Sequence, residues 1–293
     1  MQKQNCLFII NPISGLGRQK EIPDLIHKQL NAHRFAYDLV TTEYAGHAHD
    51  LAARHHQDYD LLVAVGGDGT VNEVASGLLG KSAALGVIPL GSGNGFARHF
   101  GIDLNAGKAL EQLNYSQRES MDTGLLNQKP FFNVSGVGFD GQISKTFAKQ
   151  LTRGFVTYAR CVMSELQTYR PKKISYIVND REVEGQFFLI AFANTTQYGN
   201  NAVIAPQANP QDGLLDVVII KAFPPLYLPA FTMMSLFRAL HHSPYVEIIK
   251  TSSIKLNNPE EAPIHIDGEF VSNDKKIDVS ARKASLQVMI PVK

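Results

Sequence analysis

Residues 66–70, Gly66-Gly67-Asp68-Gly69-Thr70, combine three glycines with one charged side chain. They follow an apolar run at 61–65, and a helical pattern begins near Thr70. Because glycine has no Cβ, such a stretch lets backbone amides lie against a ligand, and anionic phosphate is the usual one. The alternative is a tight strand-to-helix turn in which Asp-Gly only supplies a positive φ angle. This stretch alone leaves both interpretations open.

Three more polar turns follow apolar runs in the first 100 residues. They are Asn-Pro-Ile-Ser-Gly at 11–15, Thr-Thr-Glu at 41–43 and Gly-Ser-Gly-Asn-Gly at 91–95. Helical patterns separate the four runs, and this alternation predicts a parallel sheet with right-handed crossovers. Ligands of such sheets bind at the carboxyl ends of the strands. We therefore expect all four turns to meet in one cleft.

The pattern changes after about residue 120, where strands follow one another through short turns. Strands are predicted at 118–127, 130–137, 173–178, 182–193, 214–221, 246–256 and 278–291, and helical stretches at 140–168 and 226–240. Asn179-Asp180 has the composition of a hairpin turn. We predict an α/β plus all-β chain. Its N-terminal parallel-sheet α/β domain covers residues 1–122, and its C-terminal antiparallel β-sandwich domain covers 123–293. The last strand is free to return to the first domain.

The composition is that of an ordinary globular chain, with 293 residues, 44% hydrophobic and 19% charged. A net charge of +1 gives no field that would favour nucleic acid. Cys6 and Cys161 have no metal-type spacing, which predicts free thiols and a reducing, cytoplasmic setting. No apolar run reaches the roughly 18 residues of a membrane span, so we expect a soluble protein.

Neither common nucleotide fingerprint is present. A Walker loop needs Lys-Ser/Thr after its last glycine, and no such pair follows these glycines. The Rossmann fingerprint needs Gly-x-Gly-x-x-Gly after the first strand, whereas Gly91, Gly93 and Gly95 alternate after the fourth. These absences argue against a dinucleotide-dependent oxidoreductase.

Five blocks along the chain share their order and spacing with a known family. They are Asn-Pro-x-Ser-Gly at 11–15, Gly-Gly-Asp-Gly-Thr-x-Asn-Glu at 66–73, Pro-x-Gly-Ser-Gly-Asn at 89–94, Ile-Ala-Pro and Asp-Gly-Leu-Leu-Asp-Val within 204–217, and His-Ile-Asp-Gly-Glu at 265–269. In these residues the chain resembles the diacylglycerol kinase catalytic domain family, which includes bacterial soluble lipid kinases and the sphingosine and ceramide kinases. The resemblance covers nearly the whole chain.

The resemblance implies a nucleotide-binding α/β domain and a β-sandwich lipid-substrate domain, with ATP and lipid meeting between them. It implies transfer of the γ-phosphoryl group of ATP, with Mg²⁺, to a hydroxyl of diacylglycerol or a related lipid. Carried over residue by residue, it predicts ATP contacts from these positions: Asn11, Pro12, Ile13, Ser14, Gly15, Thr42, Gly66, Gly67, Asp68, Gly69, Thr70, Asn72, Glu73, Gly91 and Ser92. For Asn72 and Glu73 the alternatives are a role in orienting the loop or in reaching a metal through water, and a first-turn carboxylate that only complements the helix dipole.

Two carboxylates compete for the role of catalytic base. The resemblance to bacterial lipid kinases assigns it to Asp267, whereas sphingosine kinase-like enzymes use the aspartate of Gly-Gly-Asp-Gly, here Asp68. We favour Asp267 as the base and Asp68 as a group on the phosphate or Mg²⁺ side. The local alternative for Asp267 is an ordinary Asp-Gly hairpin turn.

The resemblance also implies a structural Mg²⁺ at an acidic turn. Its ligands would be the carboxylate of Asp212 and the carbonyl oxygens of Asn209 and Leu214. One carboxylate with backbone oxygens suits a hard cation.

Substrate and partners are less defined by the sequence. Gly95 stands where bacterial diacylglycerol kinases carry aspartate, and the Gly-Ser-Gly-Asn sequence before it resembles the corresponding sequence of sphingosine kinases. A sphingoid base is therefore an alternative substrate. An NAD kinase-like enzyme and a catalytically silent nucleotide- or lipid-binding regulator are weaker alternatives. A basic set could support transient contact with a membrane surface, although a solvated helix face explains it more simply. It comprises Lys145, Lys149, Arg153, Arg160, Arg170, Lys172 and Lys173. The hypothesis places the protein in phospholipid metabolism, and a homodimer is left open.

Overall fold

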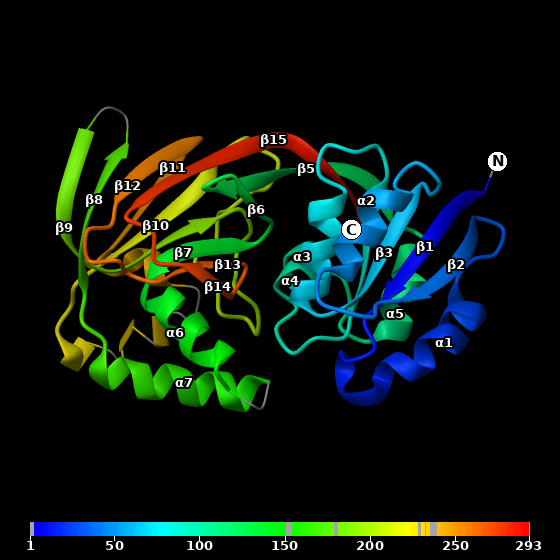
Figure 1. Cartoon of the computed structure of the whole chain (residues 1–293), viewed down its shortest axis with the longest axis horizontal. Coiled ribbons are helices and arrows are strands. Elements are labelled where there is room, and N and C mark those ends of the chain that lie inside the picture. The colour runs from blue at the N-terminus through cyan, green and yellow to red at the C-terminus, as the bar shows by residue number, and fades with distance from the viewer. Residues whose placement is uncertain are drawn as a thin grey trace. The chain divides into compact units, whose positions relative to one another are not determined.

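The computed structural model describes residues 3–150, 154–178, 181–227, 230–231, 233–234 and 239–292. It consists of two compact units (Figure 1). Unit 1 comprises residues 1–122 and 284–293, and unit 2 comprises residues 123–283. The sequence left open whether the last strand returns to the first domain. It does return, and residues 284–293 belong to unit 1.

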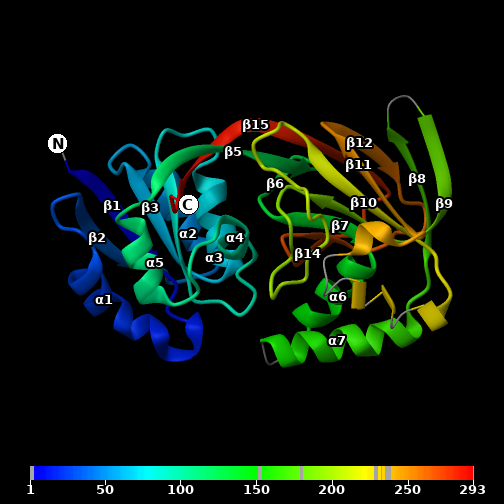
Figure 2. The ribbon, with the colours of Figure 1, turned by 180° about the vertical axis from the view of Figure 1, so that it is seen from behind.

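A parallel sheet forms the centre of unit 1 (Figure 2). Its strand order is β15-β4-β3-β1-β2. The strands are β1 (Gln4–Ile10), β2 (Phe35–Thr41), β3 (Leu61–Gly66), β4 (Ala84–Pro89) and the last part of β15 (Lys276–Ile290). β3 and β4 are buried over their whole length, which is why their sequences are apolar without alternation. β2 lies at the edge and is half exposed.

Helices connect these strands. They are η1 (Gly15–Glu21), α1 (Ile22–Gln29), α2 (His47–His55), α3 (Asp68–Gly77), α4 (Gly95–Phe100) and α5 (Ala106–Leu113). α2 and α3 approach so closely that a Cβ built on Gly77 would lie 2.7 Å from the Cβ of Ala52. α3 begins at Asp68, with Gly67 as its N-cap residue. The predicted start near Thr70 was therefore two residues late.

Unit 2 is built from antiparallel strands. They are β6 (Lys129–Phe131), β7 (Val134–Gly138), β8 (Lys172–Val178), β9 (Arg181–Ala193), β10 (Leu215–Lys221), β11 (Val246–Thr251), β12 (Ser253–Asn257), β13 (Ile264–Ile266) and β14 (Glu269–Ser272). β5 (Gln117–Leu126) and β15 contribute residues to both units. β9 pairs with β7, β8 and β10.

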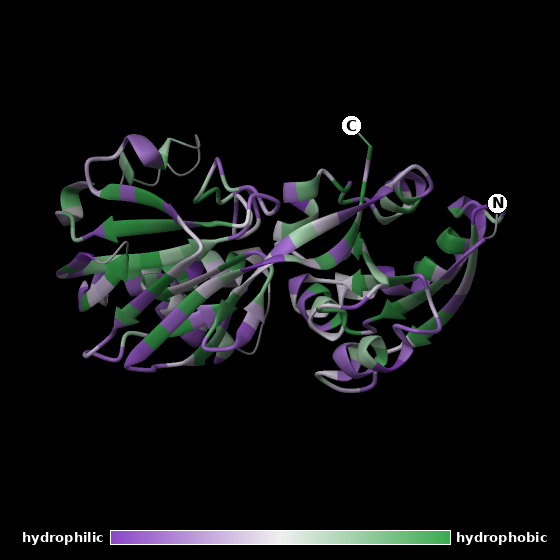
Figure 3. Ribbon diagram, turned by 90° about the horizontal axis from the view of Figure 1, so that it is seen from above, coloured by the Kyte–Doolittle hydropathy of each residue, from purple (hydrophilic) through white to green (hydrophobic). Residues whose placement is uncertain are grey.

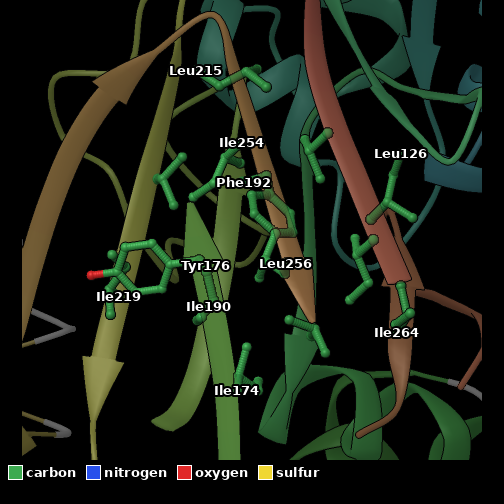
Figure 4. Packing of buried hydrophobic residues seen from close by; sticks show 14 of the residues in the cluster. Leu126, Ile174, Tyr176, Ile190, Phe192, Leu215, Ile219, Ile254, Leu256 and Ile264 are labelled. Atoms are coloured by element: carbon green, nitrogen blue, oxygen red, sulfur yellow. The ribbon is translucent and has the colours of Figure 1, made fainter. Parts of the chain in front are cut away.

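Side chains from the strands of unit 2 fill a buried core. Figure 4 shows Tyr176 of β8, Ile190 and Phe192 of β9 and Leu256 of β12 in one cluster. In Figure 3 hydrophobic residues gather along the strands, as burial of a sheet face requires. Gly124 leaves room for the ring of Phe131, which a Cβ at residue 124 would overlap.

Some predicted elements differ from the observed ones. The helix predicted over 140–168 is two helices, α6 (Phe139–Ala148) and α7 (Phe155–Thr168). Gly154 precedes α7 with a φ of +112°, which no α-helix contains. The strand predicted over 246–256 is divided into β11 and β12. No described helix is both long and apolar enough to cross a bilayer.

Two predictions fall wholly or partly on residues outside the described ranges. The hairpin turn at Asn179-Asp180 lies outside them, although β8 and β9 on either side do pair antiparallel. Of the helix predicted over 226–240, positions 228–229, 232 and 235–238 lie outside them. Short 3₁₀ turns, η2 (Pro225–Tyr227) and η3 (Leu240–His242), stand at the two ends of that stretch.

Candidate active site

The four polar turns of unit 1 lie at one edge of the parallel sheet. Ile10, the last residue of β1, pairs with Thr41 of β2 and Val65 of β3, and Gly66 pairs with Pro89 of β4. The carboxyl ends of all four strands are therefore level. Backbone hydrogen bonds continue this register into the turns, from Thr42 N to Ile10 O at 2.9 Å and from Leu90 N to Gly66 O at 2.7 Å.

Asn11 shapes the first turn. Its Nδ2 donates to Thr70 Oγ1 at 3.0 Å, and its Oδ1 accepts from the amide of Ile13 at 3.1 Å. Pro12 and Ile13 are exposed beyond it, and Ser14 and Gly15 are partly buried. The Asn11 side chain thus joins this loop to α3.

Gly15 and Arg18 attach the first turn to the fourth. Gly15 has a φ of +75°, and a Cβ there would lie 3.1 Å from the Cβ of Leu90. Arg18 donates from Nε to the carbonyl of Gly15 and from Nη2 to the carbonyl of Leu90, both at 3.1 Å. The Arg18 guanidinium thus places a positive charge beside the first and fourth turns. Arg18 was not identified from the sequence, where its position three residues after Gly15 was the one indication of this role.

The glycines of the third and fourth turns allow these turns to touch. A Cβ on Gly91 would lie 2.7 Å from Gly67 Cα, and a Cβ on Gly93 would lie 2.7 Å from Asp68 Oδ2. A Cβ on Gly66 would overlap the side chain of Thr70. Close approach of a neighbouring backbone therefore explains Gly91, and close approach of the Asp68 and Thr70 side chains explains Gly93 and Gly66, beyond any contact with phosphate.

Asp68 binds the start of α4. Its Oδ2 accepts from the amide of Asn94 and its Oδ1 from the amide of Gly95, both at 2.8 Å. Burial raises the pKa of the Asp68 carboxyl above its usual range, although the amide hydrogen bonds from residues 94–96 oppose the shift. Asn94, with a φ of +51°, donates from Nδ2 to the carbonyl of Gly91 at 2.8 Å. One carboxylate thus links the two glycine turns.

Glu73 caps a neighbouring helix. Its Oε1 accepts from the amide of Gly46 at 3.0 Å, and its Oε2 accepts from the amide of Ala48 at 3.2 Å. These are amides of the first turn of α2, so the carboxylate also complements the dipole of that helix. Asn72 accepts from Ser76 Oγ at 3.4 Å. The sequence left open whether Glu73 orients the loop, reaches a metal or complements the dipole of its own helix. Its carboxylate complements a helix dipole, but that of α2 and not that of α3.

The other predicted nucleotide residues differ in exposure. Thr42 is 8% exposed at the end of β2, and Ser92 is exposed in the fourth turn. Gly69 and Thr70 lie in the first turn of α3, where helical amides have no partner within the helix. The four turns therefore bring backbone amides and glycines to one edge of the sheet, where Arg18 and Arg98 donate to carbonyls of the first and fourth turns.

Asp267 lies in unit 2, in the two-residue turn between β13 and β14. Asp267 and Gly268 have φ angles of +47° and +87°, as a type I′ hairpin turn requires. The carboxylate does not only serve the turn, because Oδ2 accepts from the amide of Phe132 at 2.9 Å and Oδ1 from the amide of Asn133 at 2.8 Å. Two amides thus fix the carboxylate in one orientation.

A buried polar group adjoins this turn and was missed from the sequence, where His265 was left unassigned. His265 Nε2 lies 3.0 Å from Asp140 Oδ2, and the amide of Gly268 donates to His265 Nδ1 at 3.1 Å. Asp140, in the first turn of α6, carried no local motif.

A second buried carboxylate, Asp122, was also not identified from the sequence. It is 1% exposed on β5 and accepts a hydrogen bond from the amide of Ala284 at 2.7 Å.

The turn predicted to hold a structural Mg²⁺ already contains a cation. Lys250 Nζ lies 2.9 Å from Asp212 Oδ2 and 3.4 Å from Asp216 Oδ1. The other oxygen of Asp212 accepts from the amide of Leu214 at 3.0 Å, and Asn209 Oδ1 accepts from the amide of Gln211. Among the described residues, no group of three or more His, Cys, Asp or Glu side chains could hold a metal ion. A divalent ion would have to displace the ammonium, so this site stays a prediction.

We expect Lys250→Met to make the stability of unit 2 responsive to Mg²⁺. Removal of the ammonium leaves Asp216, 4% exposed, without its ion pair, which should cost about 1–2 kcal/mol of unfolding free energy. Added Mg²⁺ can then take the vacated position between Asp212 and Asp216. Thermal unfolding with and without Mg²⁺ measures this, with Lys255→Met as the control. An equal response to Mg²⁺ in both variants would remove the metal site.

Comparison with known proteins gives the chain a family. Residues 5–126 match the diacylglycerol kinase catalytic domain, and residues 133–289 match the YegS C-terminal NAD kinase beta sandwich-like domain. The chain belongs to the diacylglycerol kinase and YegS-like lipid kinase family. It is an enzyme, a lipid kinase of that family. The predicted family is confirmed.

Full-length relatives agree with this membership. A diacylglycerol kinase of Mycobacterium tuberculosis is 29% identical over 97% of this chain and 94% of its own. A protein of Pseudomonas aeruginosa named "Probable lipid kinase YegS-like" is 31% identical over 80% of this chain and 77% of its own. The crystal structure of a diacylglycerol kinase from Bacillus anthracis str. Sterne has a TM-score of 0.77 at 20% identity, covering 99% of this chain and 98% of that one. The predicted combination of a parallel α/β domain and a β-sandwich domain is thereby confirmed.

Proposed function

We propose that this lipid kinase transfers the γ-phosphoryl group of ATP to a hydroxyl of diacylglycerol or a closely related lipid. The observation that supports it most is the level edge of the unit 1 sheet, where four turns meet, three of them with glycines, beside the start of α3. Phosphoryl transfer needs little covalent chemistry from the protein and depends on holding phosphates and spreading their charge. Helix-start amides and glycine turns do this for anions.

The residues predicted to contact ATP divide into two roles in this proposal. Gly67, Gly69 and Thr70 bring amides and the positive end of α3 toward phosphate oxygens. Asn11, Asp68 and Glu73 hold the turns in place through the hydrogen bonds described above. Mg²⁺ would arrive with ATP, its ligands being mainly phosphate oxygens and water, as is usual for this ion.

Asp267 is the proposed base that accepts the proton of the lipid hydroxyl. Each of its oxygens accepts one backbone amide, and a carboxylate oxygen can accept more than one hydrogen bond. The amides also orient the carboxylate in advance of the reaction. Asp68 is the weaker candidate, because the amides of residues 94–96 donate to its carboxylate, which thereby holds the third and fourth turns together.

A sphingoid base is the second candidate substrate. Gly95, where bacterial diacylglycerol kinases carry aspartate, supports it. In this chain Gly95 begins α4 and its amide donates to Asp68. A carboxylate is therefore missing at that position, and the acceptor lipid of this enzyme can differ from diacylglycerol.

Contact with a membrane surface belongs to the same proposal, because the substrate is a lipid. Part of the basic set is already paired: Lys172 with Glu260 at 3.6 Å and Lys173 with Glu184 at 2.6 Å. Lys145 donates to Asn273 and lies over the ring of Phe270. Arg153 lies outside the described residues. On α7, Val156 and Met163 are exposed beside Arg160, and this face is the part of the set best suited to a lipid surface.

A lipid panel tests the proposal. Purified protein is incubated with γ-labelled ATP, Mg²⁺ and mixed micelles that contain dioleoylglycerol, sphingosine, ceramide or monoacylglycerol. We expect labelled phosphatidic acid as the main product. Labelled sphingosine phosphate in its place would select the second candidate. ATP binding without phosphorylation of any lipid would overturn the proposed substrate class, and transfer to NAD would favour a soluble acceptor.

A further inference from the structure

A chain of buried polar groups stands directly behind the Asp267 turn. His265 on β13 is 1% exposed, and Asp140 at the start of α6 is 9% exposed. Nε2 of His265 lies 3.0 Å from Asp140 Oδ2, and the amide of Gly268 donates to Nδ1 at 3.1 Å. The chain therefore runs from a carboxylate through an imidazole to the backbone of the residue that follows Asp267.

The hydrogen bonds define the tautomer of His265. Because Nδ1 accepts from the Gly268 amide, it carries no proton, and a neutral imidazole then has its proton on Nε2. That proton faces Asp140 Oδ2, which also accepts from the Tyr198 hydroxyl at 3.0 Å. Burial raises the pKa of Tyr198 well above its usual value, with the charge of Asp140 adding to the shift, so its hydroxyl stays a donor.

The surroundings are built to keep these groups in place. The amide of Gly141 donates to Asp140 Oδ1 at 2.8 Å, and Ser135 Oγ donates to the carbonyl of His265 at 2.6 Å. A Cβ on Gly136 would overlap Asp140 Oδ2, so this glycine of β7 makes room for the carboxylate. An ionised carboxylate is costly to bury without such partners.

We propose that Asp140 and His265 are positioning residues that hold the Asp267–Gly268 turn in its reactive conformation. The inference rests on the proposed role of Asp267 as base. The turn has two consecutive positive φ angles, one of them at the non-glycine Asp267, and such a conformation persists only where neighbours hold it. The amides of Phe132 and Asn133 hold the Asp267 side chain, and His265 holds the backbone after it.

A purely structural role is the competing explanation. Asp140 stands in the first turn of α6, where any carboxylate complements the helix dipole. That role needs neither a defined tautomer of His265 nor an acceptor for the Gly268 amide. The two explanations therefore differ in whether the Gly268 amide needs an acceptor at residue 265, and in which substitution restores turnover.

The first experiment reads the tautomer by ¹⁵N NMR of the imidazoles in wild type near pH 7.5. Loss of one signal set in His265→Asn assigns the ring among the ten histidines. We expect the Nε2–H tautomer with a slowly exchanging proton, and a shifted Gly268 amide in Asp140→Asn. An Nδ1–H tautomer or a ring open to solvent would overturn the proposal. This result does not depend on whether Asp267 is the base.

The second experiment compares variants of His265 in the kinase assay. The amide oxygen of His265→Asn can still accept near the Nδ1 position, whereas His265→Leu has no acceptor. We expect kcat to fall on the order of 10- to 100-fold in His265→Leu and Asp140→Asn, with the KM for ATP unchanged. His265→Asn should recover most of that loss. Equal losses in the two His265 variants, or a change in KM alone, would contradict positioning. If Asp267→Asn keeps its turnover, the base assignment fails instead, and the tautomer result still stands.

Discussion

Asp267→Asn is expected to lower kcat by about 10²- to 10⁴-fold while the affinity for ATP stays within about twofold. The amide has nearly the size of the carboxylate but cannot accept the hydroxyl proton. Its Oδ1 keeps one of the two amide hydrogen bonds from Phe132 and Asn133, and its Nδ2 faces the other donor. ATP affinity is spared because the predicted nucleotide residues all lie in unit 1. Initial rates with the lipid identified by the panel, together with calorimetric titration of an ATP analogue, measure both quantities.

Asp278→Asn is the matched control for this substitution. Asp278 is an exposed aspartate of β15 in the same unit, so the same chemical change is made away from the turn. Its kcat should remain that of wild type. Turnover of Asp267→Asn within tenfold of wild type would remove Asp267 as the base.

The parallel half of the fold was readable from the sequence because its signals are local. Unbroken apolar runs such as 61–65 and 84–89 become strands that are buried along their whole length. Once the strands are parallel, their carboxyl ends must lie together, so the grouping of the turns at 11–15, 42, 66–70 and 91–94 followed from topology. The register of Ile10 with Thr41 and Val65 is the structural expression of that rule.

The hydrogen-bond partners of individual side chains could not be predicted from the sequence, because these bonds join residues that are distant in the chain. Glu73 was considered for a metal, but its oxygens accept amides 25 and 27 residues earlier in the chain. Asp68 accepts amides 26 and 27 residues later. Asp140 and His265 are 125 residues apart, and no local motif around either residue indicates the other as its partner. Propensity and periodicity describe one element at a time, and these contacts arise only when elements pack.

The break between α6 and α7 has a different cause. The stretch 140–168 has a continuous helical pattern of apolar and polar residues, and a single glycine is tolerated within such a pattern at a cost of about 1 kcal/mol. At Gly154 the chain adopts a φ of +112° and α7 starts afresh after it. The two helices can then pack against each other within unit 2, where Thr146 of α6 donates to Glu165 of α7 at 2.6 Å. Tertiary packing decided this boundary.

Asp68→Ala should have the second large effect, a loss of ATP binding together with reduced stability of unit 1. Alanine leaves the amides of Asn94 and Gly95 without their acceptor at the start of α4. Removing a carboxylate from buried amides costs about 1–3 kcal/mol, reduced here by the burial that already raises the pKa of Asp68. The larger consequence is geometric. Asp68 links the third and fourth turns, so we expect kcat/KM for ATP to fall at least about 100-fold.

Asp58→Ala is the control for Asp68→Ala, since Asp58 is an aspartate of unit 1 whose side chain is 65% exposed. Calorimetric titration of an ATP analogue and the amide NMR signals of residues 91–96 are measured in both variants. Unchanged ATP affinity and unchanged signals in Asp68→Ala would show that the fourth turn does not depend on this carboxylate. Loss of affinity in Asp58→Ala as well would indicate a general loss of folding.

The pH dependence of the unfolding free energy of Asp68→Asn tests whether Asp68 is present to link the two glycine turns or only as a buried charge. Because the pKa of Asp68 is raised in the folded protein, the folded state holds this proton more tightly than the unfolded chain does. Its contribution to stability is fully present below the unfolded pKa, about 4, and is lost as the pH rises through the higher folded pKa. Asparagine does not titrate, so the unfolding free energy of Asp68→Asn should improve relative to wild type as the pH rises above about 4. If ATP affinity stays low while stability improves in this way, the carboxylate is retained for the geometry of the two glycine turns and at a cost in stability.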